Sequence, residues 1–327
     1  MFPILPQDLE AVALYRDFLP RRIFDAHVHL HAEGTVPHSF NPNGSFRRPS
    51  ATVEDYLTDV RPFFPDVDSL SMQMMPMPDP VMNDRTNGLR DRANLHVSSQ
   101  LASHAGNVGA VYVMRGDSEE EIERMLSLPH VGSIKCYWFS AEKANGEDCT
   151  VSEFLPEAAW RVAHRRHLPI VLHMMHAHAL SDPRNYTYVT RMASRYPNAN
   201  LILAHCARAF AAWTGVRAIR ELEDCGNIWF DLASVCEPDP MMACILKYGG
   251  NRVLWGTDYP ICMFRGKAVS IGSGFCWLDA AHLPASAKPT TVLAESLSAL
   301  YRSSLLLDLD QTQIDRIFFS NAASLFS

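Results

Sequence analysis

The sequence predicts a (β/α)8 barrel with an extra N-terminal helix and C-terminal closing helices. Eight short runs of β-branched or aliphatic residues alternate with longer amphipathic segments, which is the pattern of repeated βα units around a parallel sheet. No linker rich in Pro, Gly or Ser divides the 327 residues, and a barrel of this kind commonly takes about 250 residues or more. We therefore expect one domain over residues 1–327.

The strands follow from the apolar runs, in chain order. They are Ile23–Leu30, Ser69–Met75, Val108–Met114, Val131–Phe139, Ile170–Met174, Leu201–His205, Ile228–Ala233 and Arg252–Asp258. The segments between them place apolar residues at helical spacing, and several begin near a Pro or an Asp, which favours the start of a helix. They include Glu119–Leu128, Val151–Arg166, Tyr188–Tyr196, Ala212–Glu223 and Pro240–Tyr248.

Segments outside the βα repeat complete the predicted fold. Gln7–Phe18 predicts the extra helix, which we expect to cover the closed end of the barrel, and Leu293–Leu307 and Gln311–Ser324 predict the closing helices. Two connections, Ala32–Thr52 and Tyr259–Pro289, are longer than a barrel needs. Because long loops at the carboxyl ends of barrel strands usually build the active site, we expect the site at that end.

The composition excludes several classes of protein. With 29 Lys and Arg against 36 Asp and Glu, the net charge is −7, which leaves no basic surplus for nucleic acid or an anionic membrane. The longest apolar run, Met241–Leu246, is too short to cross a membrane, and the N-terminus lacks the pattern of a secretory signal. We expect a soluble, cytoplasmic protein whose eight dispersed cysteines are free thiols.

The strongest local signal for chemistry is the segment FDAHVHL at residues 24–30. Side chains alternate between the two faces of a strand, so His27 and His29 point the same way. Both can then reach one metal ion if their face looks into the barrel. The chain has 14 histidines, so this pair, taken alone, is as consistent with coincidence as with a metal site.

Three further strands end in residues that ligate metals. His173 ends the fifth strand, His205 the sixth and Asp258 the eighth. Singly, such a histidine is more often a satisfied residue near the core, and such an aspartate a helix N-cap. Together they lie at the carboxyl edge where barrel enzymes carry their catalytic groups. This coincidence favours a metal site, and imidazole and carboxylate ligands make Zn²⁺ the default among the divalent ions.

The motifs together resemble the metal-dependent amidohydrolase superfamily, in the branch that contains aminocarboxymuconate semialdehyde decarboxylase. They are FDAHVHL at 24–30, IVLHM at 170–174, LILAHC at 201–206, NIWFDLAS at 227–234, NRVLWGTDYP at 251–260 and SNAASLF at 320–326. The resemblance implies that His27, His29, His173 and Asp258 bind a divalent metal, and that His205 is a catalytic or second-metal residue. It also implies a homodimer, since relatives are commonly dimers.

Lys135 lies on the fourth predicted strand. Some members of the superfamily carry there a carboxylated lysine that bridges two metals, whereas the decarboxylase that this sequence resembles works with one. An inward ammonium group can instead pair with a substrate carboxylate or a neighbouring acid. We expect one metal ion, and two only if Lys135 is carboxylated.

Further residues have expected roles in catalysis and in binding a small-molecule substrate. In a hydrolytic mechanism Asp258 takes the proton of the attacking water, and His205 stabilises the oxyanion or protonates the leaving group. Arg208, three residues after His205, is either a clamp for a substrate carboxylate or a surface arginine. Trp138 is either an aromatic wall for a planar substrate or a packing residue.

Three functions are consistent with this set of residues. The leading one is a metal-dependent hydrolase that cleaves a C–O or C–N bond, in a lactone or amide, of a small carboxylate-bearing metabolite. The second is a metal-dependent, non-oxidative decarboxylase of an aromatic or dienoic acid, which uses the same residues. The third is a catalytically silent barrel that binds a ligand, although a binding scaffold does not need metal ligands on four strands.

Overall fold

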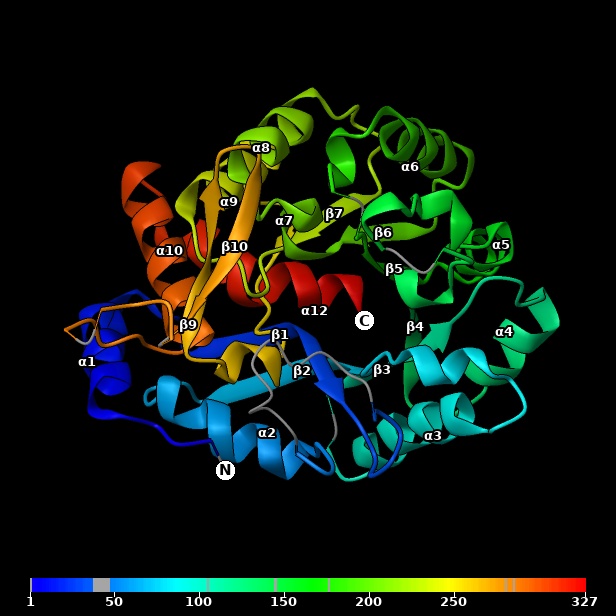
Figure 1. Cartoon of the computed structure of the whole chain (residues 1–327), viewed down its shortest axis with the longest axis horizontal. Coiled ribbons are helices and arrows are strands. Elements are labelled where there is room, and N and C mark those ends of the chain that lie inside the picture. Colours follow the sequence, from blue (N-terminus) through cyan, green and yellow to red (C-terminus); the bar gives the residue numbers. More distant parts are fainter. Residues whose placement is uncertain are drawn as a thin grey trace.

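The computed structural model describes residues 2–37, 48–104, 106–143, 146–175, 177–279, 281–284 and 286–327. Eight parallel strands neighbour one another in chain order (Figure 1), which confirms the predicted barrel. They are β1 (Arg22–Leu30), β2 (Ser69–Pro76), β3 (Val108–Val113), β4 (Val131–Tyr137), β5 (Pro169–His173), β6 (Asn200–Leu203), β7 (Ile228–Asp231) and β8 (Val253–Leu254).

Three backbone hydrogen bonds close the barrel between β8 and β1. Ala26 N donates to Trp255 O at 2.9 Å, Asp258 N to His27 O at 2.8 Å, and His29 N to Tyr259 O at 2.7 Å. Gly256 is needed at this seam, because a Cβ there would lie 2.9 Å from the Cβ of His27. The closure therefore brings the FDAHVHL and GTDYP segments together.

Helices surround the barrel, most of them as the periodicity predicts. They are α1 (Pro6–Leu14), α2 (Val53–Val60), α3 (Leu89–Leu101), α4 (Glu119–Leu126), α5 (Glu157–Arg166), α6 (Pro183–Arg195), α7 (Ala204–Arg208), α8 (Ala212–Glu221), α9 (Pro238–Tyr248), α10 (Val292–Leu306), α11 (Gln311–Asp315) and α12 (Asn321–Leu325). Side-chain caps fix several starts: Thr52 accepts from Asp55 N at α2, and Ser118 from Glu121 N at α4. No described helix is long and apolar enough to cross a membrane.

The expected position of the N-terminal helix is wrong. Helix α1 ends at Leu14 and packs against α10. The end of the barrel where β1 begins is covered instead by α12 and the residues after it, where the ring of Phe326 stacks on Phe24 with centroids 5.5 Å apart. Apolar contacts thus keep this end closed.

A β-bulge in β1 decides which of its side chains enter the barrel. The pairing of β1 with β2 shifts register between Asp25 and Val28. Before the shift, Phe24 and Ala26 pack among the inward residues of the other strands. After it, Val28 packs with the outer core, which turns the neighbouring histidines inward. Without the bulge, strict alternation would place the His27 side chain on the outer face of the barrel, because Ala26 points inward.

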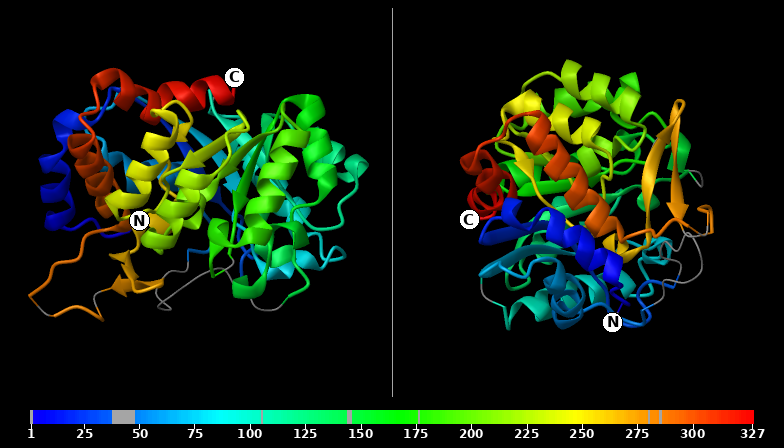
Figure 2. Two further views of the ribbon diagram at one scale, coloured as in Figure 1. Left: turned by 90° about the horizontal axis from the view of Figure 1, so that it is seen from above. Right: turned by 90° about the vertical axis from the view of Figure 1, so that its left-hand side faces the viewer.

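The long connection after β8 holds an antiparallel hairpin. Strand β9 (Gly266–Ile271) pairs with β10 (Gly274–Asp279), and Figure 2 shows the hairpin on the face of the molecule opposite α12. The sequence analysis treated this stretch as loop. The hairpin stands at the carboxyl end of the barrel strands, where we expect the site.

Candidate metal centre

The barrel seam brings three ligand atoms together. His27 Nε2 and His29 Nε2 lie 3.1 Å apart, and Asp258 Oδ1 lies 3.6 Å and 3.5 Å from them. All three residues are buried. The described residues therefore bring together three of the four predicted ligands.

Hydrogen bonds fix the tautomers of the two imidazoles. His27 Nδ1 donates to Asp231 Oδ2 at 2.8 Å, and His29 Nδ1 donates to the carbonyl of Pro76 at 3.2 Å. Each Nε2 then carries a lone pair, and both lone pairs face the Asp258 carboxylate. The lone pairs of three donors this close together repel one another unless a proton or a cation lies between them. The set therefore fits a divalent metal ion.

Burial tunes the protonation of this cluster. It lowers the pKa of His27 and of His29 well below the ordinary value, and the charge of Lys135 lowers both further. Burial also raises the pKa of the Asp258 carboxyl well above its usual range, which Lys135 opposes. The imidazoles are therefore neutral at pH 7 and ready to ligate, and Asp258 has an unusually high affinity for a proton.

Lys135 on β4 lies inside the same cluster. Its Nζ is 3.3 Å from His27 Nε2, and its side chain is completely buried. Burial lowers the pKa of its amine to about 8, against the opposing charges of Asp231 and Asp258. Because the Nε2 lone pair of His27 accepts only one partner, Lys135 and a metal ion compete for it.

His173 and His205 form a second part of the site. His173 Nδ1 lies 3.0 Å from His205 Nε2, and His205 Nδ1 donates to the carbonyl of Ala233 at 2.8 Å. Within the described residues, ligand atoms close enough to share an ion form two groups: His27, His29 and Asp258, and His27, His205 and Asp231. His173 thus contacts His205 and joins neither group.

Asp231 is the functional residue that the sequence analysis missed. It ends β7, and besides holding His27 its Oδ1 accepts from the backbone N of His205 and of Ala233, at 2.8 and 3.1 Å. One carboxylate therefore orients two of the site histidines. The available signal was its place in NIWFDLAS, an acidic residue that ends an apolar strand as Asp258 does.

Aromatic rings and Arg208 lie beside the histidines. The ring of Tyr137 lies 4.3 Å from that of His173, whereas Trp138 contacts Tyr137 and Phe139. The Arg208 guanidinium lies 5.3 Å from the ring centroid of Phe275 on the hairpin. Its charge is close enough to contribute to the lowered pKa of His173, after burial, His205 and Lys135. Tyr137, which the sequence analysis did not name, is therefore an aromatic residue in direct contact with a site histidine.

The short element α7 is a left-handed turn and not a right-handed helix, and it carries His205 and Arg208. The four consecutive residues 205–208 all have φ between +52° and +58°, a region that is costly for residues with a Cβ. The turn reverses the direction that alternation along β6 would give His205. Strain of this kind, retained at a site, is typical of functional segments.

Comparison with known proteins gives the family. The model described as Amidohydrolase matches residues 24–327. A search of curated proteins gives no match. Among solved structures, 5-carboxyvanillate decarboxylase from Sphingomonas paucimobilis is 14% identical with a TM-score of 0.59, over 94% of this chain and 99% of that one.

Two further structures show the same fold. An amidohydrolase from Burkholderia multivorans with bound zinc is 12% identical with a TM-score of 0.58, over 93% of this chain and 98% of that one. A protein from Pseudomonas putida, provisionally assigned as a 2-pyrone-4,6-dicarboxylic acid hydrolase, is 16% identical with a TM-score of 0.50, over 94% and 98%. The family match spans most of this chain and includes its converging histidines and aspartate. The chain therefore belongs to the amidohydrolase family and is an enzyme of the class of metal-dependent hydrolases and related decarboxylases.

Proposed function

We propose that this protein is a metal-dependent hydrolase that cleaves the C–O or C–N bond of a lactone or amide in a small, carboxylate-bearing metabolite. The observation that carries the proposal is the Asp258 carboxylate, buried against the unprotonated Nε2 atoms of His27 and His29. A buried carboxylate with a raised pKa is suited to accept a proton from water. Family membership supports the reaction class.

The ion that we propose is a single Zn²⁺ held by His27, His29 and Asp258, with His173 as the fourth ligand. Imidazole nitrogens and a carboxylate are donors that zinc prefers, and the Burkholderia multivorans relative contains zinc. When bound, the ion would supply Lewis-acid chemistry, activating water and polarising a carbonyl. A second ion is expected only if the Lys135 amine is carboxylated.

Asp258 and His205 would divide the proton transfers. Asp258 takes the proton of the attacking water. His205 donates its only N–H to Ala233 O, and burial lowers its pKa, so its Nε2 is an acceptor and offers no hydrogen bond to an oxyanion. His205 can protonate the leaving group only after it gains a proton at Nε2, and the proton that Asp258 takes from the water is the source available for this transfer. This order replaces the direct oxyanion contact that the sequence analysis allowed.

Arg208, Lys135 and Trp138 would recognise the substrate. Arg208 presents a planar guanidinium whose donors match a carboxylate, and its contact with Phe275 braces it at the hairpin. The Lys135 ammonium is suited to a second anionic oxygen. We place Trp138 in the outer wall, behind Tyr137. The expected ligand is thus a small, planar acid.

Non-oxidative decarboxylation of an aromatic or dienoic acid is the second candidate. Two cations, Lys135 and Arg208, lie among the site histidines and favour binding of a carboxylate that is then lost. The likeness to 5-carboxyvanillate decarboxylase agrees with this. A proton must then be delivered to carbon, and the Lys135 ammonium, with its pKa of about 8, is the suitable donor.

Metal content followed by product analysis tests these functions. About one zinc per chain, in protein purified without chelators or a metal-affinity tag, supports the single-ion site, and about two favours a carboxylated Lys135. The loaded enzyme is then given a panel of lactones, amides and aromatic carboxylic acids. Acid release without gas supports the hydrolase, whereas CO2 release supports the decarboxylase. No bound zinc and no turnover, even after zinc is added back, would leave the silent barrel.

A further inference from the structure

The backbone of Asp258 lies in the left-handed region, with φ at +64°. This region is costly for a residue with a Cβ, and such a conformation persists only where the surrounding structure holds it. The conformation matters to the candidate site, because it places the Asp258 carboxylate 3.6 and 3.5 Å from Nε2 of His27 and His29. The residues on both sides of Asp258 are therefore the place to look for what holds it.

Asp25 on β1 holds Thr257, the residue before Asp258. Its Oδ1 accepts a hydrogen bond from the backbone N of Thr257 at 2.9 Å, and its Oδ2 accepts one from Thr257 Oγ1 at 2.6 Å. The same Oδ1 accepts from the backbone N of His27 at 3.1 Å. Asp25 is completely buried, and hydrogen bonds to a carboxylate are stronger than those between neutral groups. One side chain thus ties together the segments that carry His27 and Asp258.

Asp59 on α2 holds Tyr259, the residue after Asp258. Its Oδ2 accepts from Tyr259 Oη at 3.1 Å and from the Arg48 guanidinium at 2.5 Å, and its Oδ1 accepts from Phe2 N at 3.0 Å. Asp59 and Tyr259 are both completely buried. Arg48 supplies the opposite charge that a buried carboxylate needs, so the anchor for Tyr259 is itself satisfied.

Tyr56 joins these two carboxylates from one turn before Asp59 on α2. Its Oη donates to Asp25 Oδ2 at 2.8 Å. Its ring meets the ring of Tyr259 edge to face, with centroids 5.4 Å apart. Helix α2 therefore braces both anchors at once.

We propose that Asp25 and Asp59 are positioning residues for Asp258. Each carboxylate fixes one neighbour of Asp258, so the backbone is held in the left-handed conformation from both sides and the Asp258 carboxylate stays aimed at the two imidazoles. The inference rests on the proposed function, because the ligand set that it keeps in place is the one proposed for zinc. It adds to that function a reason why the ligands are in place before the ion arrives.

The backbone seam of the barrel is the alternative explanation for the position of Asp258. Asp258 N donates to His27 O, and His29 N donates to Tyr259 O. If these bonds sufficed, the side-chain anchors would contribute to stability and not to metal binding. Variants that delete an anchoring hydroxyl group but keep the seam therefore separate the two explanations.

Tyr259→Phe and Thr257→Val each delete one such hydroxyl group and leave the proposed ligands unchanged. We expect each to lower the zinc affinity of the full chain about tenfold or more, as loss of outer contacts at metal sites commonly does. Competition with a chromogenic chelator measures the affinity. Thr257→Ser keeps a hydroxyl group at this position and should bind zinc as the wild type does.

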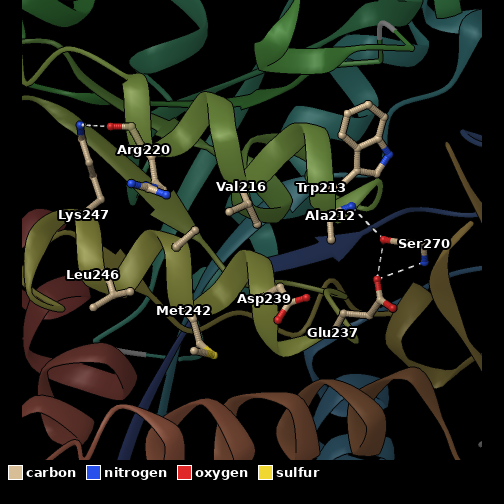
Figure 3. Close-up of a pocket in the computed structure, with 11 residues that line it drawn as sticks. Ala212, Trp213, Val216, Arg220, Glu237, Asp239, Met242, Leu246, Lys247 and Ser270 are labelled. Atoms are coloured by element: carbon tan, nitrogen blue, oxygen red, sulfur yellow. Dashed lines mark hydrogen bonds between the residues drawn. The ribbon is translucent and has the colours of Figure 1, made fainter. Parts of the chain in front are cut away.

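Two matched controls lose comparable hydrogen bonds away from the metal cluster. Tyr188→Phe on α6 loses the bond from its Oη to the Leu155 carbonyl, at 2.8 Å. Ser270→Ala, in the groove between α8 and α9, loses a hydroxyl group that lies 2.6 Å from Glu237 Oε2 (Figure 3). Both should keep the zinc affinity of the wild type, and urea unfolding of the metal-free proteins compares their losses of stability with those of the test variants.

The outcomes separate this inference from the proposed function. Weaker zinc binding in Tyr259→Phe and Thr257→Val alone, with similar losses of stability in the controls, supports the positioning role. Zinc affinity that is unchanged in both test variants, or that falls equally in the controls, overturns the positioning role and leaves the zinc site standing. A wild type that binds no zinc overturns the zinc site and the positioning role with it.

Discussion

Asp231 shows how much one buried carboxylate decides at this site. It accepts hydrogen bonds from Nδ1 of His27 and from the backbone N of His205. Because Asp231 keeps the proton of His27 on Nδ1, the lone pair on Nε2 points toward the other donor atoms of the cluster. A hydrogen bond to the ring nitrogen that does not bind the metal commonly fixes the tautomer of a metal-binding histidine. We propose the same role for Asp231.

Asp231→Asn should lower zinc affinity about 10–100-fold. The amide oxygen can still accept from the backbone, but its NH2 group then faces His27 Nδ1 and forces the proton onto Nε2, which blocks the lone pair. Competition with a chromogenic chelator measures the affinity. Asp224→Asn, at an exposed carboxylate near the start of the same strand, is the control. Equal affinities of all three proteins would contradict this role.

Asp258→Asn should abolish turnover while leaving the fold intact, because an amide cannot take the proton from water. Loss of activity is expected to exceed about a hundredfold. It is measured as kcat on whichever substrate the panel identifies, with circular dichroism and zinc content recorded in parallel. Undiminished turnover would remove Asp258 from the mechanism, and unfolded protein would make its role structural.

At the scale of single elements, the left-handed turn at residues 205–208 is the least expected feature. Alternation along β6 continues to Ala204, and the positive φ angles then redirect His205 and bring Arg208 toward the hairpin. Cysteine and alanine lie at positions where glycine would fit without strain. The turn therefore stores conformational energy beside the site.

Replacement of Ala207 by glycine tests this strain. Glycine adopts a positive φ without strain, and this gain in free energy offsets the loss of a buried methyl group. Ala207→Gly should therefore change the free energy of unfolding by less than about 1 kcal/mol. Ala159→Gly, at an equally buried position within α5, should cost about 1–2 kcal/mol. Urea unfolding compares the two. Equal losses would show that residue 207 is unstrained.

At the scale of the whole molecule, the metal cluster and barrel closure depend on the same residues. His27, His29 and Asp258 contribute both the ligand atoms and two of the backbone hydrogen bonds between β8 and β1. An ion bound there would join the first strand to the last. Metal binding and folding should therefore be linked.

Zinc should stabilise the whole barrel. An ion that binds only the folded state at 100 times its dissociation constant adds about 2.7 kcal/mol to the free energy of unfolding. Urea unfolding with zinc, and with zinc removed by chelator, measures the difference. His29→Ala should lose this increment while His282→Ala, at an exposed histidine, keeps it. A zinc increment unchanged in the His29 variant would place the ion elsewhere.

Local periodicity and short motifs in the sequence were enough to predict the barrel, the strand-end residues of the candidate site and the family. The bulge in β1, the left-handed turn after β6 and the tautomers of His27 and His29 required the tertiary structure. Each depends on contacts between residues far apart in the chain, such as Asp231 with His27 and Gly256 with the His27 Cβ. Such contacts select the backbone angles, and these angles set the direction of each side chain. The alternation of residues along a strand carries no information about these contacts.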